Sequence, residues 1–385
     1  MRKSLVLFLT VIIMVASLSG CMGDSKDENV SAGGNFEKEG VVVNTFGLEP
    51  LAERTTVTVG FFSGSTHSSP FYIADKMGFF DELNIDLEYE TFINGPAMME
   101  ASSNWDICDV GGPGILNGMK NYDVRMVGVC DYEYNLGVFA RPDSEIAKDP
   151  KNPEVWKGKK VILPTGTVLQ VIMLRYLESM GLGQDDIKII SMDVTSGLTA
   201  FKAGEGDIYC GWNAFAFIAE DEGYIRITDG GQMGLQNVSG LGATIDAMNN
   251  NKEGLEAAWM LYYLTWQWAQ ESDENMDKAI KLFVESCEDE GVLADENICR
   301  RELDIFACPS PIEAVKLFTT EENDVMNKAE RKVLIAENNL FEILDFFIST
   351  GSYTEEDRNY ILDNNLVDPS IAKSAKLKLE AAGQF

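Results

Sequence analysis

The chain has 385 residues, of which 45% are hydrophobic. This length exceeds what one hydrophobic core ordinarily organises, so we expect two domains. The 31 Lys and Arg residues against 62 Asp and Glu give a net charge of −31. This balance argues against a nucleic-acid partner, because phosphate binding needs a basic surface.

The N-terminus has the order of a secretory signal peptide: Arg2 and Lys3, an apolar run over residues 4–18, and small residues before Cys21. Leu18-Ser19-Gly20-Cys21 resembles a bacterial lipobox, in which the cysteine receives a lipid. The alternative is a transmembrane anchor, which normally needs about 20 apolar residues. We expect a cleaved signal over residues 1–20 and a protein exported and lipid-anchored to the bacterial cell membrane through Cys21, on its extracellular face or in the periplasm.

Residues 21–54 are rich in Gly, Ser, Asp, Glu and Lys and lack periodicity, so we expect a flexible tether. From residue 55 a pattern of strand, loop and helix repeats. β-Branched residues indicate the strands, and Ser69-Pro70 is typical of a helix start. The expected strands of this first series are residues 56–61, 85–89, 106–110 and 124–129.

A second series begins near residue 157 and has the same order. Its expected strands are residues 160–163, 187–191, 208–211 and 224–227. Alternating strands and helices at this spacing favour parallel, twisted sheets with helices on both faces. Beyond about residue 247 the pattern becomes helical, and the expected helices are residues 255–270, 275–290, 310–318, 323–350 and 354–365.

The first of these C-terminal helices is strongly aromatic. Its large rings are Trp259, Tyr262, Tyr263, Trp266 and Trp268. Such a group can form a ligand box, but at helical spacing it more often packs against the core. We therefore expect packing.

Six cysteines remain if Cys21 carries the lipid: Cys108, Cys130, Cys210, Cys287, Cys299 and Cys308. An exported protein can form disulfides, and the spacing allows a bridge among the last three or between the first two. The alternative is that most are buried thiols, and the sequence leaves the connectivity open. With one histidine and no Cys-x-x-Cys pair, we expect no metal site and no cofactor.

An ordered set of motifs over roughly residues 55–245 resembles the solute-binding proteins of ABC importers, in the nitrate/sulfonate/taurine class. The segment Pro70-Phe71-Tyr72-Ile73-Ala74-Asp75-Lys76-Met77-Gly78-Phe79-Phe80, followed by Ile85-Asp86-Leu87-Glu88, is similar to the opening of that family. Further matches are Asp106-Ile107 before Gly111-Gly112, residues 156–161 before Pro164-Thr165-Gly166-Thr167, residues 177–181, and residues 203–207. Asn84 stands where the family usually has glycine.

This resemblance implies an α/β protein with the two-lobe, type II periplasmic-binding-protein fold. Each lobe would be a twisted, mostly parallel sheet with helices on both faces, and a helical extension would follow at the C-terminus. Residues 55–138 and 242–385 would form lobe one, and residues 139–241 would form lobe two. Two hinge strands would cross between the lobes, near residues 136–141 and 240–245.

In open α/β sheets a ligand binds at the carboxyl ends of the strands, where helix N-termini offer free backbone N–H groups. The alternative role for the Ser, Thr and Asn residues there is helix capping. His67, the single histidine, lies in the first of these loops. The candidate ligand-binding residues are Ser65, Thr66, His67, Asn94, Gly112, Asp131, Tyr132, Glu133, Thr165, Thr167, Trp212 and Asn213.

No Lys or Arg occurs in the loops at the strand ends, which are residues 62–70, 93–97, 111–115, 130–135, 163–168 and 211–215. Backbone amides and hydroxyls alone would therefore hold a sulfonate. The loop Cys130-Asp131-Tyr132-Glu133-Tyr134 instead offers two carboxylates and two aromatics. Asp131 and Glu133 would accept an amine, and Tyr132 or Trp212 would stack on a ring or cation. The alternative is a solvated acidic turn.

The leading hypothesis is a monomeric binding protein that closes on a small polar ligand, sulfonate-like or an amine or nitrogen heterocycle, and docks on an ABC permease. A ligand sensor for a membrane receptor is the second hypothesis. The third is an enzyme similar to the thiamine-pyrimidine synthases, which share this fold. It is disfavoured because the loops lack a lysine for pyridoxal phosphate.

Overall fold

The computed structural model describes residues 36–38, 41–133, 135–235, 237–323 and 331–385. The expected signal peptide, Cys21 and Tyr134 lie outside these ranges. In the described residues, no helix combines the length and apolar character that a membrane crossing requires.

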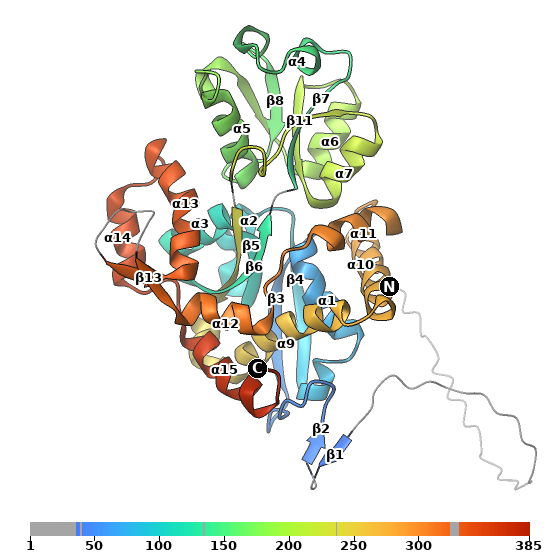
Figure 1. The fold of residues 1–385 in the computed structure, drawn as a ribbon, viewed down its shortest axis with the longest axis vertical. Helices are drawn as coiled ribbons and strands as arrows, with labels where there is room; N and C mark the ends of the chain where they lie inside the picture. Colours follow the sequence, from blue (N-terminus) through green and yellow to red (C-terminus); the bar gives the residue numbers. More distant parts are fainter. Residues whose placement is uncertain (1–35, 39–40, 134, 236, 324–330) are drawn as a thin grey trace, which may run out of the picture. The chain divides into compact units, whose positions relative to one another are not determined.

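The first five-stranded sheet carries lobe one (Figure 1). Its order is β4 (Ile85–Phe92), β3 (Thr55–Phe62), β5 (Ile107–Gly111), β12 (Asn237–Thr244) and β6 (Val124–Glu133). β3 runs parallel to β4 and β5, and β12 runs antiparallel to β5 and β6. β-Branched and aromatic residues such as Val57, Val59 and Phe61 are buried along β3, as expected for a central strand.

The second sheet carries lobe two. Its order is β11 (Ile225–Thr228), β7 (Leu136–Ala140), β10 (Ile208–Trp212), β8 (Lys160–Leu163) and β9 (Lys188–Ser191). β8 is parallel to β9 and β10, whereas β7 is antiparallel to both of its neighbours. The helices of this lobe are α4 (Glu145–Lys148), α5 (Val168–Glu178), α6 (Val194–Lys202) and α7 (Asn213–Asp221).

The two-lobe fold is confirmed, and each sheet is mostly parallel, as expected, with one antiparallel strand that makes it mixed. β12 and β7 are the strands that depart, because each follows directly from a strand of the other sheet. The chain leaves the first sheet after Glu133 and enters the second at Leu136; it leaves the second after Thr228 and re-enters the first at Asn237. Both passages come just before residues 136–141 and 240–245, the two stretches where hinge strands were expected.

The short helices of lobe one are α1 (Ser69–Lys76), α2 (Gly95–Glu100), α3 (Gly112–Asn121) and α8 (Ile245–Asn250). Between α1 and β4, Asn84 has a positive φ of 61°. Glycine adopts this left-handed conformation freely, and asparagine tolerates it better than most other residues. Asn84 can therefore stand where a glycine was expected.

The C-terminal region packs on lobe one as a set of helices. They are α9 (Lys252–Gln270), α10 (Asp273–Asp289), α11 (Glu296–Ile305), α12 (Pro311–Thr319), α13 (Ile335–Ser349), α14 (Glu355–Asp363) and α15 (Ser370–Ala381). The expected helix over 323–350 was too long, since β13 (Glu321–Asn323) pairs with β14 (Lys332–Leu334). α11 and α15 were missed.

The aromatic rings of α9 form packing contacts, as expected. Trp259, Tyr262, Tyr263 and Trp266 are buried, and α9 lies against α1, α10 and α15. Three of the rings also anchor strands and loops: Trp259 Nε1 donates to Val127 O at 2.9 Å, Tyr263 Oη to Val129 O at 2.8 Å, and Tyr262 Oη to His67 O at 2.8 Å.

Part of the expected tether belongs to the folded body. β1 (Phe36–Lys38) pairs with β2 (Val41–Val43), and Phe46 and Leu48 are buried. The Phe46 ring meets Phe79 edge to face at 4.8 Å. The segment 44–54 therefore packs on lobe one through its apolar residues. The polar composition of the segment did not indicate this packing.

The six described cysteines are free thiols, five of them buried. No disulfide pairs Cys108 with Cys130, because β12 lies between their strands. Nor are Cys287, Cys299 and Cys308 bridged in this part of the chain.

Candidate functional site

The first β–α connection of lobe one places His67 at the candidate site. β3 ends at Phe62, and a 3-10 turn follows over Thr66–Ser68. Ser65 caps this turn, accepting from His67 N at 3.2 Å. Tyr262 holds the same turn from behind through the His67 carbonyl. The imidazole is thus fixed on both sides and is only 3% exposed.

Two carboxylates at the end of β6 face this imidazole. Asp131 and Glu133 are two residues apart, so they project to the same face of the strand. His67 Nε2 lies 2.9 Å from Glu133 Oε1 and 3.5 Å from Asp131 Oδ2. Asn237 Nδ2 donates to the other oxygen of Glu133. The predicted acidic loop is therefore a buried cluster and not a solvated turn.

The backbone also stabilises Asp131. Its Oδ1 accepts from Ala307 N at 2.8 Å and from Tyr132 N at 2.7 Å. Ala307 follows α11, so the C-terminal region contributes directly to the site.

The cluster favours charged forms of its central pair. Burial alone would lower the pKa of His67, but the charge of Glu133 and the contact with Asp131 raise it well above its usual range. Burial alone would raise the pKa of Glu133, but the imidazolium of His67 lowers it. Burial raises the pKa of Asp131. One imidazolium therefore lies beside two acidic groups.

Asp109 on β5 is a further acidic group at the site, and it was missed from the sequence. It is buried and accepts from Ser68 Oγ at 2.7 Å. Burial raises its pKa to about 6. An aspartate within the apolar run Ile107-Cys108-Asp109-Val110, just before two glycines, was the available signal.

Three helices begin at the same pocket. α3 comes from lobe one, and α5 and α7 come from lobe two. Their N-cap residues Gly111, Thr167 and Trp212 make no side-chain capping hydrogen bond, and Thr167 Oγ1 donates to Pro164 O instead. Such helix starts offer backbone N–H groups and a partial positive charge to an anion.

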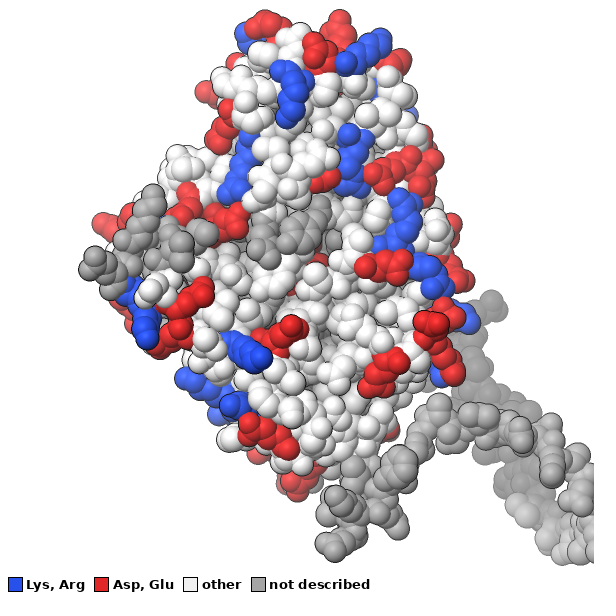
Figure 2. Space-filling view, in the orientation of Figure 1, with Lys and Arg blue, Asp and Glu red and all other residues white. Residues whose placement is uncertain are grey.

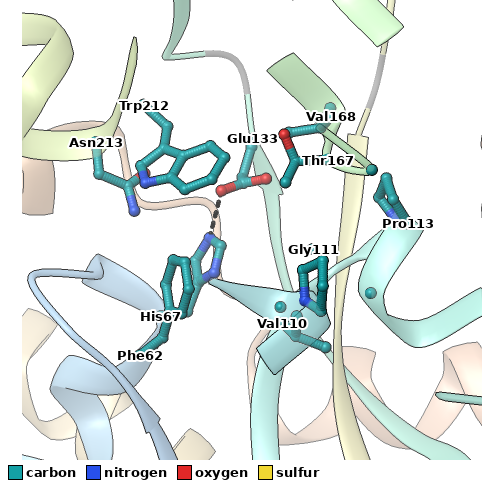
Figure 3. A pocket seen from close by; sticks show the side chains of 14 residues that line it. Phe62, His67, Val110, Gly111, Pro113, Glu133, Thr167, Val168, Trp212 and Asn213 are labelled. Atoms are coloured by element: carbon teal, nitrogen blue, oxygen red, sulfur yellow. Dashed lines mark ion pairs between the residues drawn. The ribbon is translucent and has the colours of Figure 1, made fainter. Parts of the chain in front are cut away.

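These elements enclose an inner pocket. Figure 3 shows the Glu133 carboxylate near its centre, with Trp212 and Thr167 to either side and His67 below. Phe62, Val110 and Pro113 add apolar walls. The volume of about 40 Å³ compares with roughly 10–15 Å³ for one water molecule on the same scale. The inner pocket therefore admits a group of only a few non-hydrogen atoms.

A second pocket of about 330 Å³ adjoins it and shares Glu133 and Asn213 with it. Glu302 of α11 lies there, accepting from Thr66 Oγ1 at 2.6 Å and Asn135 Nδ2 at 2.8 Å. Burial raises the pKa of Glu302 to about 7. Sequence reasoning missed this residue, although it lies four positions after Ile298 on the apolar face of α11.

The structure brings together five of the twelve candidate residues in the inner pocket: His67, Glu133, Thr167, Trp212 and Asn213. Thr66 and Asp131 line the adjoining pocket. Ser65 supports the site from behind, where its Oγ lies 3.4 Å from Asn213 Nδ2 of the other lobe.

The other four candidates lie at the margin or outside. Asn94 caps α2 through Ala97 N, and the Thr165 hydroxyl meets Ser191 Oγ at 3.0 Å. Gly112 starts α3, and a Cβ at this position would come 2.9 Å from the Val238 carbonyl oxygen. Tyr132 lines a separate pocket with Cys308 and Pro309, and Asn339 Nδ2 donates to its hydroxyl at 2.9 Å, because strand alternation turns it away from Asp131 and Glu133.

No group of three or more His, Cys, Asp or Glu side chains is placed to hold a metal ion within the described ranges. The outer surface offers no broad basic patch among the described residues of the face in Figure 2, where acidic and basic side chains are interspersed.

The sequence profile of the NMT1/THI5-like family matches residues 65–274 of this chain. A putative ABC transporter periplasmic binding protein of Brachyspira hyodysenteriae is 22% identical over 318 residues, covering 76% of this chain and 82% of the relative.

Solved structures share the fold. The nitrate-binding protein NrtA of Synechocystis PCC 6803 has a TM-score of 0.64 at 14% identity, covering 86% of this chain and 91% of its own. The alkanesulfonate-binding protein SsuA of Xanthomonas axonopodis, bound to MOPS, has a TM-score of 0.56 at 16% identity, covering 69% and 90%. The desulfurization enzyme DSZB has a TM-score of 0.56 at 13% identity, covering 84% and 99%.

Proposed function

We propose that the chain, which belongs to the NMT1/THI5-like family, is the extracytoplasmic substrate-binding protein of an ABC importer. The relative in Brachyspira hyodysenteriae, which this chain matches over 82% of its length, is named a putative ABC transporter periplasmic binding protein. Two solved neighbours are named as nitrate- and alkanesulfonate-binding proteins. The observation that carries the proposal is the convergence of three uncapped helix starts, from both lobes, on one pocket beside His67 and Glu133.

The pocket chemistry supports a small ligand that carries both signs of charge. Backbone N–H groups at the starts of α3, α5 and α7 suit an anionic group such as a sulfonate. The acidic side chains around His67 outnumber its single positive charge, which favours a protonated amine or nitrogen heterocycle. The Trp212 ring, 5.8 Å from Phe62, provides an apolar surface for the rest of the ligand.

Binding rather than catalysis is the better-supported role, although DSZB shows that the fold also serves an enzyme. The residues that line the inner pocket of the described chain include no lysine or cysteine nucleophile. An imidazolium held by a carboxylate is also a poor general base, since it already carries its proton.

Isothermal titration of the full chain with zwitterionic, anionic and cationic probes tests the proposal. Taurine, methanesulfonate and ethylamine share parts of one structure, so their affinities separate the two charge contributions. We expect taurine to bind more tightly than either single-charge probe. Asp131→Ala with Glu133→Ala should weaken ethylamine and taurine more than tenfold, with methanesulfonate less affected.

The matched control is Asp81→Ala with Asp86→Ala, which removes two exposed carboxylates of lobe one. Equal weakening by both double variants, or no binding of any probe, would contradict the proposed ligand chemistry.

Export and membrane attachment complete the proposal. We propose that Cys21 receives a lipid, that the protein acts as a monomer, and that its partner is an ABC permease. Cys21→Ser should then release the protein from cell membranes into the soluble fraction. Unchanged membrane association would favour an uncleaved anchor.

A further inference from the structure

A third pocket opens next to the inner pocket and shares four of its lining residues: Pro96, Pro113, Gly114 and Gly166. We name it the outer pocket. Its volume of about 610 Å³ is far larger than the 40 Å³ of the inner pocket. A ligand whose polar group fills the inner pocket therefore has more room for a larger group in the outer pocket than in the second pocket of about 330 Å³.

The outer pocket has a wall of large apolar side chains. Phe346 and Phe347 come from α13, Tyr353 from the segment after it, and Leu174 from α5 of lobe two. The Phe347 ring lies 5.5 Å from the Tyr353 ring and 5.8 Å from the Phe346 ring. Aromatic surfaces of this kind bind apolar and aryl groups by burial and ring contact.

Beside the outer pocket, α13 contacts α5 of lobe two. The Arg175 guanidinium of α5 lies 5.4 Å from the Phe346 ring centre, and Arg175 Nη1 is 3.6 Å from Glu342 Oε1. The outer pocket thus has walls from lobe one, lobe two and the C-terminal region. α13 begins at Ile335, beyond residue 274 where the family match ends.

We propose that the outer pocket is a second subsite, which binds an apolar or aryl substituent of the ligand whose charged group occupies the inner pocket. This inference rests on the proposed function and extends it to a substrate class: small zwitterions or sulfonates that carry a ring or a branched alkyl group. The C-terminal helices then determine which substituent binds. The residues within 65–274, which the family profile matches, determine which charged group binds.

The test compares two probes that share one charged group. Taurine is 2-aminoethanesulfonate, and 2-(cyclohexylamino)ethanesulfonate adds only a cyclohexyl ring. We expect the cyclohexyl probe to bind the full chain at least tenfold more tightly, since the ring leaves water. Phe347→Ala should weaken the cyclohexyl probe at least fivefold and change taurine less than twofold.

Tyr360→Ala is the matched control, because Tyr360 is an exposed aromatic of the neighbouring α14 that does not line the outer pocket. It should leave both affinities unchanged. Equal affinity of the two probes for the unmodified protein, or equal weakening of both by Phe347→Ala, would overturn the second subsite while the proposed function stands.

If neither sulfonate binds, the ligand chemistry in the proposed function is contradicted, and the second subsite needs a test that does not depend on a sulfonate. Saturation-transfer NMR with benzyl alcohol, a neutral aryl probe, then gives the answer. A saturable signal that Phe347→Ala reduces and Tyr360→Ala preserves supports the subsite, and the absence of such a signal overturns it.

Discussion

His67 Nε2 lies 2.9 Å from Glu133 Oε1, so the single histidine of the chain forms a buried ion pair with the last residue of β6. The two residues come from different ends of the lobe-one segment, and the pocket closes around their contact. The pair determines the charge of the inner pocket and the protonation of its imidazole.

We predict that the imidazole of His67 loses its proton at a higher pH than an ordinary histidine, because its pKa is raised. The charge of Glu133 overcomes the effect of burial and raises the pKa of His67 well above its usual range. Since the chain has one histidine, its NMR resonances can be followed without ambiguity from pH 5 to 9. Glu133→Gln should lower the midpoint, because burial then acts without the opposing charge.

Glu88→Gln, at an exposed position of β4, should leave the His67 titration unchanged. A midpoint near 6.5 in the unmodified protein would show that the ion pair does not control the imidazole.

We predict a loss of stability with rising pH that depends on Glu302. Burial raises the pKa of Glu302 from 4.5 to about 7, so the folded state holds this proton more tightly than the unfolded chain. The stabilisation is complete below about pH 4.5 and disappears as the pH rises through 7. Its size is on the order of 3 to 4 kcal/mol, from roughly 1.4 kcal/mol per pKa unit.

Urea unfolding of the protein and of Glu302→Gln at pH 5 and pH 8 measures this effect. The unfolding free energy of the variant should change less between the two pH values than that of the unmodified protein. Parallel pH dependence in both proteins would contradict the assignment to Glu302.

We predict that the hydrogen bond from the Tyr262 hydroxyl to the His67 carbonyl supports ligand binding as well as the stability of the fold. Tyr262→Phe removes the bond to His67 O, and Tyr263→Phe removes the matching bond to Val129 O. Each should lower the unfolding free energy by about 1 kcal/mol. Only Tyr262→Phe should also weaken taurine in calorimetry, because only that hydroxyl holds the turn that carries His67. Equal effects of both variants on affinity would refute this distinction.

We predict that the backbone at Asn213 is strained for other side chains. Its φ is 46°, at the first residue of α7. Asn213→Ala should be about 1 kcal/mol less stable than Asn213→Gly, since glycine adopts this conformation without a Cβ penalty. Urea unfolding gives the difference.

Asn365 is the control for this pair of variants, with a φ of 50° at an exposed position that does not line the inner pocket. Alanine and glycine at position 365 should differ in stability by a similar amount but not in taurine affinity. Identical stabilities of Asn213→Ala and Asn213→Gly would exclude the strain.

Local pattern alone determined most of the strands and helices up to Asn250, because β-branched runs, Ser-Pro helix starts and glycine turns act over a few residues. The residue types of the segment 130–134 also indicated the acidic pair Asp131 and Glu133, although the segment was expected to be a loop. Only the extension of β6 to Glu133 showed that the two carboxylates share a face and that Tyr132 points to the opposite one.

The tertiary structure decided the rest. The mixed direction of both sheets depends on two passages between lobes, which carry no local mark. Asp109 reaches the site because β5 lies beside β3, whose end leads into the turn that carries Ser68. Glu302 reaches it because α11 packs beside the Thr66 turn. The sequence named the charged groups at the strand ends, where chemistry and spacing are local. Their pairing, their burial and the wall that α13 adds to the cleft arise from contacts between segments tens to hundreds of residues apart, which no local pattern encodes.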